Sequence, residues 1–230
     1  MWLLKRGTSI LTAKEIYDIL RAGGLTRAGA LGMLGNMMVE SSLKENIAQR
    51  GMTKLSDEQY TAAADNGLIN FALDAVGYGL CQWTYKTRKQ ALLDYAKSCG
   101  VSVGNGVMQC EFVLRELLEY YPELWKFLKE TDDIDEASDR ICKEFERPAV
   151  NNLLTRRDFA HGYEAETRED VVPYKPKDPV EATFPPDPTI KAFQLWMWNN
   201  GYWEAEKING YKSKEFFTAL EQFVKDMQTC

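Results

Sequence analysis

The sequence predicts a mainly α-helical protein with one irregular segment and a small separate unit at its C-terminal end. Residues 28–39 contain no charge and a single polar side chain, which is typical of a helix buried on all sides. Later segments repeat apolar residues at helical spacing, and six of the eight prolines fall within residues 173–188. Together these observations indicate a helical domain, an extended linker and a second unit.

The first two helices have clear boundary signals. Thr12 and Glu15 form a capping box, in which each side chain binds the backbone N–H of the other, and Gly23 ends the helix that follows. Thr26 then caps the buried helix. We therefore expect two helices joined by a short glycine turn.

Residues 41–84 break the helical pattern, with glycines at 51, 67, 77 and 79. We interpret them as loops or a short β-hairpin that form the wall of a cleft. Helical spacing returns near residues 86–98, 108–120, 134–145 and 153–167.

The prolines predict an extended, semi-rigid linker over residues 169–189. This linker divides the chain into a domain of residues 1–168 and a small, aromatic-rich unit of residues 190–230.

Composition excludes several classes of function. A net charge of −6 gives no general footprint for nucleic acid, and no apolar run is long enough to insert into a membrane. The N-terminus places its charges after a very short apolar start, unlike a secretory signal, so we expect synthesis in a cytoplasm. The sequence gives no signal for an oligomeric state.

Cysteine and histidine usage narrows the chemistry further. The five cysteines have no closely spaced pair, which favours free thiols over a disulfide framework or a zinc site. His161 is the single histidine, and its polar surroundings favour a helix surface over a catalytic centre. Phosphate-binding and dinucleotide-binding glycine motifs are missing, so we expect no cofactor and no metal. Carboxylates are then the remaining candidates for catalysis.

Glu40 directly follows the buried helix. Low-dielectric surroundings and the negative end of the helix dipole both disfavour a charged carboxylate there. A carboxyl that keeps its proton near neutral pH can act as a general acid. The alternative is that Glu40 marks the point where the helix reaches solvent, because Ser41 and Ser42 come next.

Residues 74–84 combine side chains that suit sugar binding. Aromatic faces stack on sugar rings, amides bind acetamido and hydroxyl groups, and glycines let the backbone approach a ligand. The alternative is a glycine turn that leads into a helix, with the tryptophan as a core residue. The residues concerned are Asp74, Gly77, Tyr78, Gly79, Gln82 and Trp83.

Three ordered motifs carry a family resemblance: GMLGNMMVESSL at residues 32–43, GYGLCQWT at 77–84 and FERPA at 145–149. With them, residues 10–168 resemble the phage-type lysozymes of endolysins and tail-associated lysins of Gram-positive phages. The resemblance implies an α+β fold of the lysozyme-like superfamily. It also implies hydrolysis of the β-1,4 bond between N-acetylmuramic acid and N-acetylglucosamine in bacterial peptidoglycan, for phage lysis of a Gram-positive host.

The resemblance also implies residue roles. Glu40 is the expected catalytic acid, and Tyr78, Gly79, Gln82 and Trp83 are the expected saccharide-binding wall. Asp74 is expected to orient water or to stabilise the transition state. Two further acids, Asp65 and Glu146, are not ranked by the sequence, and Arg147 and Pro148 are expected to position the helix end.

Residues 190–230 are similar to the small three-helix peptidoglycan-binding domain, in which Trp198 and Trp203 are candidate wall-binding residues. Asn209 and Ser213 depart from that family's pattern and leave the ligand open. Two alternatives to hydrolysis stay open as well: a lytic transglycosylase that forms 1,6-anhydromuramic ends, and a non-catalytic wall-binding tail component. In each case the protein is expected to act on the wall after release from the host cytoplasm, through a holin or carried by the virion.

Overall fold

The computed structural model describes residues 10–167 of the chain. The expected linker at 169–189 and the expected unit at 190–230, with Trp198 and Trp203, lie outside the described residues. The described part is mainly α-helical, as predicted. Its elements are α1 (Ala13–Ala22), α2 (Arg27–Ser41), α3 (Asp57–Asp65), α4 (Lys86–Cys99), α5 (Gly106–Tyr120), α6 (Pro122–Leu128), α7 (Ile134–Arg140), the π-helix η2 (Ile141–Glu146) and α8 (Leu153–Gly162).

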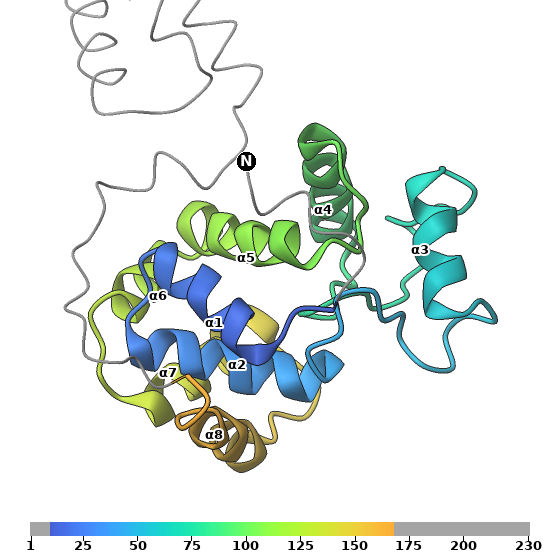
Figure 1. Cartoon of the computed structure of the whole chain (residues 1–230). Coiled ribbons are helices and arrows are strands. Elements are labelled where there is room, and N and C mark those ends of the chain that lie inside the picture. The colour runs from blue at the N-terminus through green and yellow to red at the C-terminus, as the bar shows by residue number, and fades with distance from the viewer. Residues whose placement is uncertain (1–9, 168–230) are drawn as a thin grey trace, which may run out of the picture. The chain divides into compact units, whose positions relative to one another are not determined.

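Helix α2 is the buried helix that the sequence predicts, and α1, α6, α7, η2 and α8 pack around it (Figure 1). Every residue from Ala28 to Met37 is buried, whereas Glu40 in the last turn is half-buried. The side chain of Thr26 caps the helix by accepting a hydrogen bond from the N–H of Gly29 at 3.0 Å. Among the described helices, none is long and apolar enough to cross a membrane.

A stripe of glycines on α2 explains how the neighbouring helices come so close. A Cβ atom at Gly29, Gly32 or Gly35 would lie 2.5, 2.8 or 2.2 Å from a main-chain atom of α6, α7 or α8, respectively. These distances are too short for any side chain, so the backbones of the three helices rest directly on α2. The position of α8 relative to the end of α2 is fixed by this contact.

Residues 41–84, which we expected to form loops or a hairpin at one side of a cleft, contain a helix that we did not expect. Helix α3 begins at a capping box formed by Ser56 and Gln59, and Figure 1 shows it to one side of the helices around α2. Its nine residues are mostly polar, so it lacks the apolar period by which we recognised the other helices. Within residues 10–167 the expected β-hairpin is reduced to two isolated bridges, from Tyr78 to Ala48 and to Trp83.

The helix expected over residues 134–145 is divided. It runs as α7 to Arg140 and then continues as the π-helix η2, which ends at Glu146. A second unexpected helix, α6, has proline at its first position, where a missing N–H costs no hydrogen bond.

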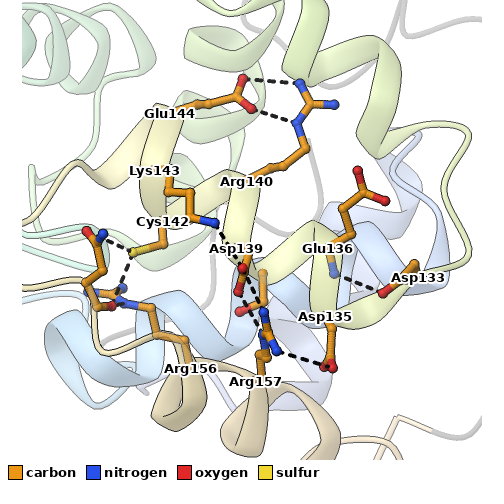
Figure 2. A network of polar contacts seen from close by, with 12 residues as sticks. Asp133, Asp135, Glu136, Asp139, Arg140, Cys142, Lys143, Glu144, Arg156 and Arg157 are labelled. Atoms are coloured by element: carbon orange, nitrogen blue, oxygen red, sulfur yellow. Dashed lines mark hydrogen bonds and ion pairs between the residues drawn. The ribbon is translucent and has the colours of Figure 1, made fainter.

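Polar contacts join α7 to α8 (Figure 2). Arg157 of α8 donates to both carboxylate oxygens of Asp139 at 2.8 Å. His161 lies on the surface, as expected, within hydrogen-bond distance of Asp135 and Glu164, and these two carboxylates raise its pKa.

Candidate active site

A cleft of about 740 Å³ lies at the C-terminal end of α2. Four segments that are distant in sequence line it: residues 40–42, residues 47–50, several residues between 81 and 88, and residues 146–149. Each of the three motifs that carry the family resemblance contributes to this lining. The cleft is therefore the place where those motifs meet.

Glu40 enters the cleft from the last turn of α2, with 18% of its side chain exposed. Its Oε1 accepts a hydrogen bond at 2.6 Å from Arg156, whose side chain is 2% exposed. Arg156 also donates to Asn36 Oδ1 at 2.9 Å and to the Asn151 carbonyl oxygen at 2.8 Å. The guanidinium thus fixes the position of one carboxylate oxygen of Glu40.

Glu146 is the second carboxyl group of the cleft, at the end of η2. Its Oε1 is buried and has no hydrogen-bond partner. Burial raises the pKa of Glu146 to about 8, and the nearby negative charge of Glu40 adds to this shift. Glu146 therefore keeps its proton near neutral pH.

Backbone strain is concentrated around the same cleft. Three non-glycine lining residues have left-handed backbone conformations: Ser42, Gln82 and Arg147, with φ of 55°, 44° and 50°. Such residues cost roughly 1–3 kcal/mol each and persist where the surrounding structure holds them, often at functional sites. Sequence patterns carry no signal for this strain.

Of the expected saccharide-binding residues, Gln82 lines the cleft and the other three do not. Tyr78 and Trp83 are fully buried, and Trp83 donates to Glu116 at 2.8 Å. Gly79 is packed so closely that a Cβ there would lie 2.6 Å from the amide oxygen of Gln109. This part of the segment matches the alternative interpretation, a glycine turn with tryptophan in the core.

Asp74 does not line the cleft that contains Glu40. Its Oδ2 accepts a hydrogen bond from the Tyr60 hydroxyl at 2.7 Å, and its Oδ1 pairs with the fully buried ammonium group of Lys89. These contacts join α3 to α4, and none of the three residues lines the cleft. Asp65 is also engaged in structure, because it accepts from the N–H of Val103 at 2.8 Å. Of the acids that the sequence left unranked, Glu146 is the one at the cleft.

Within residues 10–167, no group of three or more histidine, cysteine, aspartate or glutamate residues is placed to hold a metal ion. Cys81 lines the cleft as a buried free thiol, and burial raises its pKa well above its ordinary value. The cleft thus offers two carboxyl groups for chemistry, one of which is bonded to the buried guanidinium of Arg156.

A family model described as phage tail lysozyme matches residues 11–165 of the chain. The matched span contains every helix described above and all four segments of the cleft. A comparison with curated proteins found no match.

Proposed function

The chain belongs to the phage tail lysozyme family, and on this basis we propose that it hydrolyses the β-1,4 bond between N-acetylmuramic acid and N-acetylglucosamine in peptidoglycan. The observation that carries the proposal is the pair of carboxyl groups, Glu40 and Glu146, in one cleft of about 740 Å³. Glycoside hydrolysis needs a proton donor at the glycosidic oxygen and stabilisation of a positively charged transition state. A carboxyl group in the cleft supplies both, as the acid before the proton is transferred and as a carboxylate afterwards.

In the proposed mechanism Glu40 donates the proton. Its side chain is partly exposed in the cleft, whereas the Oε1 of Glu146 is buried. Burial keeps Glu146 protonated near neutral pH, so Glu146 adds no negative charge beside Glu40. Arg156 orients Glu40 and stabilises the carboxylate that remains after the proton has left.

The test compares two acid-to-amide variants on purified peptidoglycan. Glu40→Gln is expected to lower the rate of wall cleavage by about 10² or more, because an amide has no proton to donate. Asp74→Asn is the comparison, since Asp74 lies outside the cleft. The variant weakens the pair with the buried Lys89, so it is assayed at a temperature at which it is folded, and there we expect it to cleave walls at a rate near that of the wild type. If Asp74→Asn lowers the rate of wall cleavage as much as Glu40→Gln does, at unchanged thermal stability, then Asp74 takes part in catalysis.

Mass spectrometry of the products separates the remaining chemistries. Reducing N-acetylmuramic acid ends are expected from hydrolysis, whereas 1,6-anhydromuramic ends would identify a lytic transglycosylase. A wild-type protein that binds walls and releases no fragments would be a non-catalytic tail component.

We further propose that residues 190–230, with Trp198 and Trp203, bind the wall of a Gram-positive host. The family description refers to a tail enzyme, which supports transport to the wall in the virion over release through a holin. Detection of the protein in purified virions tests this route.

A further inference from the structure

A second cleft, of about 540 Å³, adjoins the first. Tyr85, Arg88 and Arg147 line both clefts, and Tyr120 and Tyr121 line the second one alone. Its volume is within the range of ligand-binding pockets. An extended ligand held in the first cleft can therefore continue into the second.

Two tyrosine rings of the second cleft are not used by the core. Tyr85 is 62% exposed and Tyr120 is 65% exposed. A tyrosine offers an apolar face together with a polar hydroxyl, which matches a sugar ring with apolar faces and hydroxyl edges. The walls of the second cleft thus suit continued contact with a glycan strand.

The two arginines of this cleft differ in their partners. Arg88 donates to both carboxylate oxygens of the buried Glu116, at 2.7 and 2.8 Å, so its charge is compensated. Arg147 is exposed and donates to the Tyr121 hydroxyl at 3.1 Å, with its guanidinium carbon 5.9 Å from the Tyr121 ring centroid. In the part of the chain that the structure describes, Arg147 forms no ion pair with a carboxylate. It leaves an uncompensated positive charge where the two clefts meet.

We propose that the second cleft binds a muramic acid residue of the same strand, with Arg147 pairing to a carboxylate that this sugar or its peptide stem carries. The inference rests on the proposed function and adds a basis for specificity. Chitin presents the same acetamido sugars without a carboxylate, so Arg147 favours peptidoglycan over chitin. Arg147 would then contact substrate, whereas the sequence indicated that it only positions a helix end.

The test measures binding separately from cleavage. All proteins are full-length and carry Glu40→Gln, so that ligands are not consumed. Calorimetry gives the Kd for three soluble ligands: glycan fragments with peptide stems, the same fragments after an amidase has removed the stems and left lactyl carboxylates, and chitohexaose. We expect fragments with a carboxylate to bind more tightly than chitohexaose.

Arg147→Gln, which keeps a donor for Tyr121, is expected to weaken binding of the acidic fragments about tenfold and of chitohexaose less than about twofold. The stripped fragments show whether the carboxylate is lactyl or belongs to the stem. Arg115→Gln is the matched control, because it removes the same charge from an ion pair with Glu119 outside both clefts. We expect it to leave all three Kd values unchanged.

An equal effect of Arg147→Gln on acidic and neutral ligands, or no effect on either, would overturn the proposal. Tyr120→Ala gives a second readout that does not depend on Arg147, and we expect it to weaken the binding of all three ligands. A failure of the proposed function would look different, since wild-type protein would then release no fragments from walls while the differences in Kd persist.

Discussion

At the scale of single residues, Arg156 connects the core to the cleft. It is 1% exposed, and it holds Asn36 inside α2 as well as Glu40 at the end of that helix. Asn36 is itself fixed by the carbonyl oxygens of Gly32 and Ser138, at 2.8 and 3.0 Å. The orientation of Glu40 therefore depends on a chain of buried polar contacts, all of which are satisfied.

Replacing Arg156 by methionine should affect both stability and activity. The variant leaves Glu40 and Asn36 without their partner, so we expect the free energy of unfolding to fall by about 3 kcal/mol. Wall cleavage should fall more than tenfold at temperatures where the variant is still folded. Arg157→Met is the control, because Arg157 pairs with Asp135 and Asp139 of α7, whereas Arg156 pairs with Glu40. Denaturant unfolding and a cleavage assay check both effects. Equal rates of wall cleavage by the two variants would contradict a role of Arg156 in orienting Glu40.

Glu146 should make stability depend on pH in a predictable direction. Its pKa is raised from 4.5 to about 8 in the folded protein, so between these values the folded state binds a proton that the unfolded chain has released. Its contribution to the free energy of unfolding is therefore lost as pH rises through this window, by at most about 1.4 kcal/mol per pH unit.

Glu146→Gln removes this dependence. Relative to the wild type, we expect the variant to gain stability from about pH 5 to about pH 8 and to gain no more above that. Glu144→Gln, which changes a surface residue paired with Arg140, should show no such trend. Denaturant unfolding of the three proteins across this pH range is the measurement, and parallel curves for all of them would contradict the assigned protonation.

At the scale of elements, η2 places two adjacent residues at the cleft. A π-helix has a wider turn than an α-helix, and single π-turns are frequently found at functional sites. Here the helix ends at Glu146, and the left-handed backbone of Arg147 stops it, with its N–H bonded to the Cys142 carbonyl oxygen. An uninterrupted α-helix would present these two side chains in other directions, so the helix type is part of the site.

The glycine stripe of α2 gives a prediction at this scale. Gly35→Ala places a Cβ 2.2 Å from the carbonyl oxygen of Arg156, so α8 has to move. We expect a loss of about 1–3 kcal/mol in the free energy of unfolding and a lower rate of wall cleavage, because Arg156 moves with α8. Gly162→Ala at the end of α8 meets no heavy atom within 4 Å and should leave both quantities nearly unchanged. Thermal unfolding and the cleavage assay compare the two variants.

At the scale of the whole molecule, the described residues combine a helical bundle around α2 with the irregular segment 41–84, which carries α3. The buried Lys89 of α4 holds this segment by contacting Asp74, Tyr60 and the Val76 carbonyl oxygen. Asp74 therefore has a structural role, because it links the segment 41–84 to α4.

A chain that ends at Asp170 should fold and cleave soluble glycan fragments. The matched family span stops at residue 165, and the prolines that follow predict few contacts between the two units. Its binding to intact walls should weaken. A full-length protein with both Trp198→Ala and Trp203→Ala is the comparison, and sedimentation with purified walls is the measurement. Equal sedimentation of truncated and full-length proteins would contradict a wall-binding role for residues 190–230.

The sequence by itself determined the helical class, the buried helix with its Thr26 cap, and Glu40 at the end of that helix. These features depend on local pattern: apolar content, capping residues and their spacing. Only the tertiary structure decided which acid joins Glu40, because residues 40 and 146 meet through the packing of α2, η2 and α8. The same packing buries Trp83, assigns Asp74 to Lys89 and pairs Glu40 with Arg156. Charge partners and solvent exposure are set by segments distant in sequence, and one-dimensional periodicity cannot bring those segments together.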